Sequence, residues 1–261
     1  MSRPGLIAMI GLGEAGSTLA PNLVAAGVRV RGFDPMRSAP DGVDPAGDPA
    51  EAAAGADVVL SVNSATVALE VAETVAPVLA EGCLFADLNT AAPGLKRAAA
   101  DAVAARGAGF ADVALLGIVP DWGIATPALV SGSGAEEFRA AFGPLGMPVT
   151  TVGPVAGAAA ARKLARSVFM KGLAAAVGEA LAAGEKLGCE DWLYAEIEGA
   201  LTGADAGLLR RLVEGSRRHA GRRVDEMAAA AEMLDELGVE PRVTAASEAW
   251  LRTLAEGEVP R

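Results

Sequence analysis

A glycine-rich hexapeptide, Gly11-Leu12-Gly13-Glu14-Ala15-Gly16, is the first segment whose residue types and spacing suggest chemistry. It follows a short apolar run and opens an alanine-rich segment with helical periodicity. In that position Gly11 permits a tight turn, Gly13 lets an anionic ligand approach the backbone, and Gly16 lets the helix pack close to the strand. Free N–H groups at the helix start would hold a pyrophosphate, so the segment predicts a dinucleotide site, with Glu14 also complementing the helix dipole.

A carboxylate ends the second apolar run of the chain. Asp34 lies eighteen residues after Gly16, where its oxygens can accept hydrogen bonds from both hydroxyls of an adenosine ribose. The same charge repels a 2′-phosphate, which favours NAD over NADP as the cofactor. NADP stays possible because Arg37 follows closely and can pair with such a phosphate.

Polar residues also follow two later apolar runs. Asn63 and Ser64 end one run, and Asn89 and Thr90 end the next. Ligands of open parallel sheets bind at the carboxyl ends of the strands, so we expect Asn63 and Ser64 to line the nicotinamide-ribose side of a cofactor site and Asn89 and Thr90 to bind substrate. The alternative is that these residues only cap the helices that follow them.

These segments resemble those of the β-hydroxyacid dehydrogenases, the superfamily of 3-hydroxyisobutyrate and 6-phosphogluconate dehydrogenases. Residues 7–16 resemble its N-terminal fingerprint, residues 87–93 (DLNTAAP) its D-x-S-T-x-x-P substrate loop, and residues 157–171 its lysine-bearing helix. Together with residues 219–227 they are similar to a poorly characterised branch that has its own C-terminal helical domain. The resemblance spans nearly the whole chain and implies reversible hydride transfer between a hydroxy acid and nicotinamide.

The resemblance makes Lys163 the general acid or base. Oxidation of an alcohol also releases a proton, and an amine partly removed from water has its pKa lowered enough to accept it. The alternative is a surface lysine in an ion pair. Ser167 and Lys171 follow at i+4 and i+8, so the three form one polar stripe on an otherwise apolar helix. Ser167 replaces the asparagine of the family and is expected to bind substrate, while Lys171 either binds a substrate anion or pairs on the surface.

Residues 112–118 (DVALLGI) depart from the family, which has a D-A-P-V-S-G-G pattern whose serine and glycines hold the substrate carboxylate. Only the acid and Gly117 are retained here. Gly117 is still expected at the substrate site, but Leu116, Ile118 and Trp122 favour a more apolar or larger substrate.

The elements that must position these residues alternate between short β-rich runs and alanine-rich helical segments. This alternation predicts an α/β fold, a Rossmann-type doubly wound and mostly parallel sheet over residues 1–153, followed by an all-α domain over residues 154–261. The predicted strands cover residues 6–10, 28–33, 58–62, 84–88, 109–115, 128–131 and 149–152. The predicted helices cover residues 14–26, 65–80, 93–105, 135–142, 156–187, 193–201, 206–212, 217–237 and 243–254.

Composition limits the partners of the protein. The 261 residues are 52% hydrophobic and carry a formal net charge of −11, which argues against binding to nucleic acid or to an anionic membrane. The two cysteines, Cys83 and Cys189, form no metal or disulfide pattern, and no stretch approaches the roughly 20 apolar residues of a membrane span. We therefore expect no metal and a cytoplasmic location. Long alanine- and glycine-rich helices seldom stay exposed to solvent, so we also expect a homodimer formed through the helical domain. The resemblance implies the same assembly and a small-molecule substrate.

A basic cluster, Arg217, Arg218, His219, Arg222 and Arg223, stands out in this acidic chain. Its arginines are expected to form a ladder of salt bridges, such as Arg222 with Glu226, or alternatively to capture a substrate carboxylate or phosphate. Two other functions remain open from the sequence. They are an NADPH-dependent imine reductase, which typically lacks the helix lysine, and a cofactor-binding regulator without turnover.

Overall fold

The computed structural model describes residues 3–257. The chain divides into two compact units, Met1–Arg166 and Ser167–Arg261. The boundary lies inside helix α7 (Ala158–Leu187), thirteen residues after the boundary that the sequence predicts at residue 153. The difference arises because the first turn of α7 is hydrogen-bonded to side chains of the first unit, as described below.

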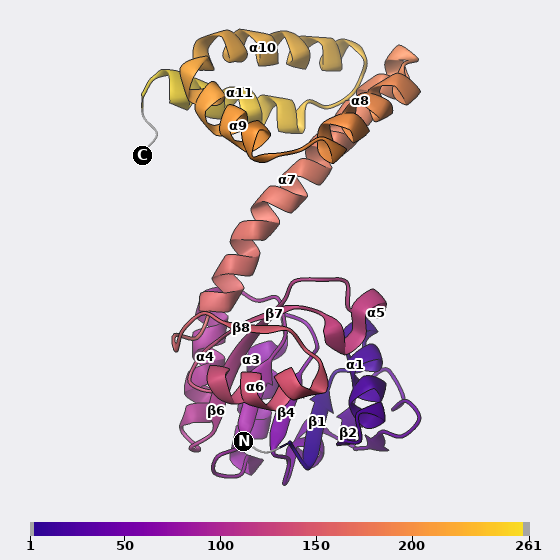
Figure 1. Ribbon diagram of the computed structural model, residues 1–261, viewed down its shortest axis with the longest axis vertical. Helices are drawn as coiled ribbons and strands as arrows, with labels where there is room; N and C mark the ends of the chain where they lie inside the picture. The colour runs from indigo at the N-terminus through magenta and orange to yellow at the C-terminus, as the bar shows by residue number, and fades with distance from the viewer. Residues whose placement is uncertain (1–2, 258–261) are drawn as a thin grey trace. The chain divides into compact units, whose positions relative to one another are not determined.

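An eight-stranded sheet forms the centre of the first unit (Figure 1). Its strand order is β3-β2-β1-β4-β5-β6-β7-β8, and every neighbouring pair is parallel except β6 and β7. The strands are β1 (Leu6–Ile10), β2 (Arg29–Phe33), β3 (Asp44–Pro45), β4 (Val58–Ser61), β5 (Leu84–Asp87), β6 (Gly109–Leu115), β7 (Ala128–Ser131) and β8 (Val149–Thr151). The predicted α/β class and mostly parallel sheet are confirmed.

Helices follow most of the strands in this unit. They are α1 (Glu14–Ala25), α2 (Pro49–Ala53), α3 (Ala68–Val75), α4 (Pro93–Ala104), α5 (Val119–Trp122) and α6 (Ala135–Phe142). Short 3-10 turns follow α3, α5 and α6 over Ala76–Val78, Gly123–Ala125 and Gly143–Leu145. The elements β3, α2 and α5 were not predicted, because segments of two to five residues are too short to show a hydrophobic period.

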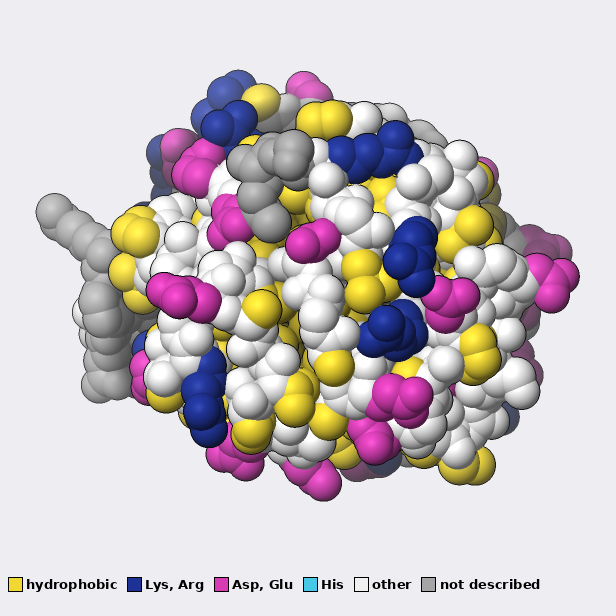
Figure 2. Space-filling view, turned by 90° about the horizontal axis from the view of Figure 1, so that it is seen from below, with side chains coloured by type: hydrophobic (Ala, Val, Ile, Leu, Met, Phe, Trp, Pro, Cys, Tyr) yellow, Lys and Arg dark blue, Asp and Glu magenta, His cyan; other side chains and the backbone are white. Residues whose placement is uncertain are grey.

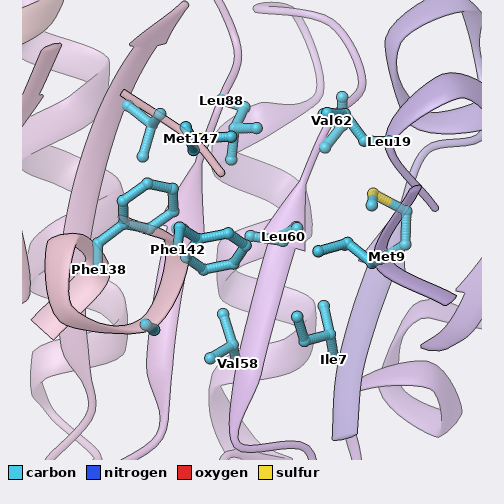
Figure 3. Packing of buried hydrophobic residues seen from close by; sticks show 14 of the residues in the cluster. Ile7, Met9, Leu19, Val58, Leu60, Val62, Leu88, Phe138, Phe142 and Met147 are labelled. Atoms are coloured by element: carbon cyan, nitrogen blue, oxygen red, sulfur yellow. The ribbon is translucent and has the colours of Figure 1, made fainter. Parts of the chain in front are cut away.

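Apolar side chains cover both faces of the sheet, as a parallel sheet requires. On one face, α1 and α6 pack on the strands, and the rings of Phe138 and Phe142 stack with centroids 4.2 Å apart. Figure 3 shows these rings beside Leu60 of β4. On the other face, buried residues of α2, α3 and α4 pack around Phe85 and Phe110. The first unit therefore has a complete core of its own.

The second unit contains the remainder of α7 and four further helices. These are α8 (Glu190–Thr202), α9 (Ala206–Arg218), α10 (Ala220–Glu236) and α11 (Arg242–Ala255). Helices α10 and α11 pack together and bury Leu234 and Leu251. The Glu179 carboxylate of α7 accepts hydrogen bonds from the N–H groups of Val243 and Thr244, at 2.7 and 2.8 Å, and so caps the start of α11. The predicted all-helical C-terminal region is confirmed.

Helix α7 is more apolar than the sequence analysis expected. Among the described residues it is the one helix whose length and composition would permit a membrane span. Its most apolar 18 residues have a mean hydropathy of 1.2, and 11% of this segment is buried. The expectation that no stretch approaches such a span is therefore wrong for α7. A single helix of this kind is weak support for a membrane segment, because the buried core helix of a soluble protein passes the same test of length and composition. On the face seen in Figure 2, acidic and basic side chains are interspersed.

Candidate active site

The three glycines of the first loop are explained by different structural features. Gly11 has a φ of +105°, and a Cβ there would lie 2.2 Å from the carbonyl oxygen of Val62. A Cβ at Gly16 would lie 1.9 Å from the carbonyl oxygen of Gly11. A Cβ at Gly13, in contrast, would meet nothing within 4 Å. The backbone itself therefore requires glycine at the first and third positions, whereas the space beside Gly13 is open to a ligand.

Asp34 is fixed at the end of β2 beside this loop. Its Oδ2 accepts the Leu12 N–H at 2.8 Å, and its Oδ1 accepts the N–H groups of Met36 and Arg37 at 2.8 and 3.1 Å. With two lone pairs on each oxygen, Oδ1 is fully used and Oδ2 keeps one for a further donor. The carboxylate is thus held in place by the backbone and can still accept a hydrogen bond from a ribose.

A cavity of about 380 Å³ lies where β1, β2 and β4 end. This is the point at which the strand order reverses, the usual ligand position in open α/β sheets. The cavity is lined by Ile10, Gly11, Phe33, Asp34, Pro35, Met36, Pro49, Asn63, Ser64, Val67, Glu70, Val71 and Thr74. Apolar walls with a carboxylate and an amide at the rim suit an adenine and its ribose.

Other residues predicted to bind the cofactor lie beside this cavity without lining it. The Leu12 side chain is 1% exposed and belongs to the core, while Ala15 packs against that core. Glu14 is an exposed residue of the first turn of α1, where it complements the helix dipole. Any contact of Leu12 or Ala15 with a dinucleotide would therefore come from the backbone.

Asn63 carries an unpaired polar atom at the cavity wall. Its Nδ2 donates to the Ser61 hydroxyl at 3.1 Å, but its buried Oδ1 has no hydrogen-bond partner. Buried acceptors are normally paired, so this oxygen fits a donor on a bound cofactor. Ser64 shares a hydrogen bond with Thr66 at 2.7 Å. The alternative that these residues cap a helix is wrong, because the N-cap of α3 is Val67, which makes no side-chain hydrogen bond.

Asn89 is buried and fully engaged within the protein. Its Oδ1 accepts the Asn63 N–H at 2.6 Å, and its Nδ2 donates to Ser61 Oγ at 3.0 Å and to Asp87 Oδ1 at 2.6 Å. It thus holds the end of β4 against the end of β5. The sequence analysis, which expected Asn89 to bind substrate or cap a helix, missed this role; the N-cap of α4 is Ala92, and only the neighbouring Thr90 is exposed to a substrate.

Lys96 is a buried residue that the sequence analysis overlooked. Its side chain is 0% exposed, and its Nζ lies 3.1 Å from Asp87 Oδ2 and 3.3 Å from Asp112 Oδ1. It also donates to the Asp87 carbonyl at 2.8 Å. The sequence feature that could have revealed this burial is the spacing along α4, where Lys96 lies on the same helix face as the buried Ala99 and Val103. A lysine on the apolar stripe of a helix needs a buried counter-charge.

Asp112 connects this ion pair to the start of α7. Its Oδ2 accepts the Ser131 hydroxyl and the Ala160 N–H, both at 3.0 Å, and the Ser131 oxygen in turn accepts the Ala159 N–H at 3.0 Å. Strands β6 and β7 thus supply the cap of α7. A carboxylate at this position is further stabilised by the positive end of the helix dipole.

Lys163 follows this cap by one turn of α7 and is half-buried. Burial lowers the pKa of its amine below the ordinary value, and the positive charges of Lys96 and Arg166 lower it further, while Asp112 opposes them. Lys163 therefore combines a fixed position in the first unit with a raised fraction of neutral amine. These are the properties that a proton acceptor near neutral pH requires.

The remaining predicted substrate residues are dispersed. Gly117 lies in the exposed loop after β6, beside Ile118 and Trp122, which are 62% and 56% exposed. Ser167 is half-buried and Lys171 is exposed, and both belong to the second unit. Within residues 3–257, Lys171 makes no ion pair, so the surface pair considered for it does not form.

The expected ladder of salt bridges in the basic cluster is also absent from the described part of the chain. None of Arg217, Arg218, Arg222 and Arg223 makes an ion pair there, and the predicted bridge from Arg222 to Glu226 does not form. Arg223 instead donates to the Ser216 hydroxyl at 2.6 Å. The described residues also contain no group of three or more histidine, cysteine, aspartate or glutamate side chains suited to a metal ion.

Comparisons with known proteins agree with this architecture. Residues 6–153 match the NAD binding domain of 6-phosphogluconate dehydrogenase, and residues 185–254 match a domain of unknown function (DUF1932). Mitochondrial 3-hydroxyisobutyrate dehydrogenase of Drosophila melanogaster is 30% identical over 207 residues, which cover 76% of this chain and 64% of that protein. The chain thus spans slightly less than two thirds of this relative.

Two further proteins extend the comparison. NAD-dependent L-serine dehydrogenase of Pseudomonas aeruginosa is 32% identical over 203 residues, covering 73% of this chain and 68% of that protein. The structure of an imine reductase from Myxococcus stipitatus in complex with NADP+ aligns with a TM-score of 0.82 at 22% identity, over 97% and 95% of the two chains, a likeness of fold. The chain therefore belongs to the superfamily of 6-phosphogluconate and 3-hydroxyisobutyrate dehydrogenases, with an NAD(P)-binding domain followed by a helical region.

Proposed function

We propose that the protein is an NAD(P)-dependent dehydrogenase that oxidises a hydroxy acid or a related alcohol reversibly, with Lys163 as the general acid and base. The observation that carries the proposal is the half-buried Lys163 amine, whose pKa is lowered and whose helix is capped by Asp112. Asp112 lies on β6 of the sheet that also forms the cofactor cavity.

The chemistry divides between the cofactor and the chain. A bound nicotinamide supplies the acceptor or donor of the hydride. The neutral amine of Lys163 takes the hydroxyl proton as the substrate carbon becomes a carbonyl, and the ammonium returns it in the reverse direction. The open space beside Gly13, the carboxylate of Asp34 and the free oxygen of Asn63 position the dinucleotide. Asp34 favours NAD, since its charge repels a 2′-phosphate.

The substrate class is inferred from the substrates named for the relatives and from one loop in which this chain departs from the family pattern. The two dehydrogenases named above act on 3-hydroxyisobutyrate and L-serine by their names, and both compounds carry a hydroxyl β to a carboxylate. Leu116 and Ile118 stand in place of the serine and the second glycine of the family pattern, and the exposed Trp122 follows in the next turn of chain. We therefore infer a hydroxy acid with a larger apolar group, with Thr90 and Gly117 of the first unit as candidate substrate contacts. The substrate roles of Ser167 and Lys171, which belong to the second unit, stay predictions.

A second candidate is reduction of imines. Imine reductases and reductive aminases share the fold with TM-scores of 0.77 to 0.82, and the apolar loop after β6 would suit their neutral substrates. Lys163 favours the dehydrogenase, because an amine with a lowered pKa is suited to taking a hydroxyl proton. A cofactor-binding regulator is the third candidate, favoured by the altered carboxylate motif alone.

We also propose that the protein forms a homodimer through the helical unit. Among the described residues of that unit only Ala183, Gly184, Ser216, Ala220, Leu234 and Leu251 are buried. Large apolar side chains are instead exposed, including Phe169, Trp192, Tyr194, Leu209 and Trp250. A unit of this size with so little core is not stable without a partner, and a second copy would supply matching apolar surface.

The location that fits this proposal is the cytoplasm. Neither cysteine is in a disulfide, and burial together with the negative charges of Asp57 and Glu137 raises the pKa of the Cys83 thiol to about 12. Such a thiol is unreactive, and free cysteines suit a reducing compartment.

The first prediction tests the cofactor site. Gly13→Ala should weaken NADH binding about tenfold or more, because the new methyl group would occupy the open space that the pyrophosphate needs. The measurement is a titration of NADH followed by its fluorescence. Gly143→Ala is the matched control, since a Cβ there also meets nothing within 4 Å and the residue lies outside the cavity. Equal affinity in both variants would show that the dinucleotide lies elsewhere.

The second prediction tests the reaction. The protein is assayed with NAD+ or NADP+ on 3-hydroxyisobutyrate, L-serine, longer β-hydroxy acids and simple alcohols, and with NADPH on cyclic imines. For the substrate that is turned over, Lys163→Ala should lower kcat about 100-fold or more and leave NADH affinity unchanged. Lys186→Ala, near the other end of α7, should be fully active. Full activity of Lys163→Ala, or turnover of imines alone, contradicts the proposal.

The third prediction concerns pH and needs no substrate. Arg166→Gln removes a positive charge that lowers the pKa of Lys163, so this pKa should rise. The rate at which an amine reagent labels Lys163, followed against pH by mass spectrometry, should therefore rise at a higher pH than in the unmodified protein. Arg162→Gln removes the same charge from an exposed side chain that does not contribute to the shift, and should leave the profile in place. A shift to lower pH would contradict the assignment.

The fourth prediction concerns assembly. Light scattering after size-exclusion chromatography should give twice the chain mass for the unmodified protein. Trp192→Glu should lower this mass, because it places a charge on the exposed apolar surface of α8. Trp122→Glu is the control, a tryptophan of similar exposure in the first unit. A monomer in the unmodified protein would overturn the assembly proposal.

A further inference from the structure

A basic hollow lies on α9 and the start of α10, apart from the residues used above. Its volume is about 500 Å³. It is lined by Gly207, Arg210, Arg211, Glu214, Gly215, Arg218, His219 and Arg223. Four guanidinium groups thus surround one hollow in a chain whose net charge is −11.

The helical spacing of α9 explains why these side chains gather. Arg211, Glu214 and Arg218 recur at three- and four-residue intervals and therefore share one face of the helix. The two glycines, also on this face, leave room between the arginines. Arg223 reaches the hollow from α10, and its hydrogen bond to the Ser216 hydroxyl at 2.6 Å holds its guanidinium. One arginine of the set is thus fixed before any ligand arrives.

The positive charges of the hollow are not neutralised within the described residues. None of its arginines makes an ion pair there, and Glu214 is the one carboxylate in the lining. The positions of Arg217 and Arg218 in the last turn of α9 are explained by the helix dipole. The dipole does not explain Arg210 and Arg211 in the middle of the helix or Arg223 on α10. Their mutual repulsion calls for an anion.

We propose that this hollow binds a small molecule that carries a phosphate group. Planar guanidinium groups bind phosphate oxygens in pairs, and several arginines around one point suit an anion of charge −2. The size of the hollow admits a metabolite. A nucleic acid would extend beyond the hollow over a chain whose net charge is −11 and be repelled, whereas a small anion contacts the arginines alone. The proposal does not depend on the dehydrogenase activity, because all its residues lie in the helical unit.

The apolar side chains of α9 lie on a different face from the hollow. Leu209, Leu212 and Val213 are exposed and cluster on the side of the helix opposite Arg211 and Arg218. A partner chain that covers the apolar face therefore leaves the basic face open to an anion.

The test is calorimetric titration of the full-length protein with inorganic phosphate, inorganic pyrophosphate and tricarballylate at low ionic strength. Phosphate and pyrophosphate should bind one site per chain, and pyrophosphate should bind more tightly than tricarballylate. The double variant Arg211→Gln with Arg218→Gln should lose at least about tenfold in affinity for pyrophosphate. The double variant Arg217→Gln with Arg222→Gln changes the net charge equally, lies outside the hollow, and should bind as the unmodified protein does.

Each other outcome overturns the proposal. Absence of binding by the unmodified protein removes the site, and equal losses in the two double variants show a general charge effect. Tighter binding of tricarballylate reassigns the ligand to carboxylates. Circular dichroism and the melting temperature of each variant verify folding, and replacement of exposed arginines should leave both unchanged. If the double variant Arg211→Gln with Arg218→Gln lowered the molecular mass measured by light scattering, and the unmodified protein bound no anion, the hollow would be a contact between two copies of the chain.

Discussion

The buried ion pair of Lys96 with two aspartates is the interaction on which the arrangement of the site depends. An isolated charge in a protein interior is very costly, and removal of one partner from a buried pair typically costs about 3–5 kcal/mol. Lys96 has no exposure to water and is bound to both Asp87 and Asp112. Because these three residues come from α4, β5 and β6, the pairing fixes one helix against the ends of two strands.

Two lines of hydrogen bonds extend from this ion pair. One runs from Asp87 through Asn89 to the backbone of Asn63 at the cofactor cavity. The other runs from Asp112 to the first N–H groups of α7, the helix that carries Lys163. The same charges act on the Lys163 pKa with opposite signs, since Lys96 lowers it and Asp112 raises it. Burial is the largest cause and Lys96 and Arg166 follow it, so the net direction of the pKa shift is downward.

The sequence predicted those parts of the molecule whose cause is local. Strands β1, β6 and β7 and helix α6 occur with the predicted bounds, because each is a continuous apolar or periodic run between turn residues. The glycine loop and Asp34 were found because their roles follow from backbone geometry. Lys96 and the internal role of Asn89 were not found, because each depends on partners that are distant in sequence and meet only in the folded sheet.

The two units of the chain solve the problem of stability differently, and this difference limits what each can do. The first unit covers both faces of its sheet and can hold a cofactor site in place by itself. The second unit leaves many of its large apolar side chains exposed, which supports the proposal that its folding is coupled to association. In α9 the apolar face and the arginine face are on opposite sides of one helix, and repulsion among the unpaired arginines opposes folding. An anion that binds the arginines relieves this repulsion, and it would therefore stabilise the same helix whose apolar face we propose for association.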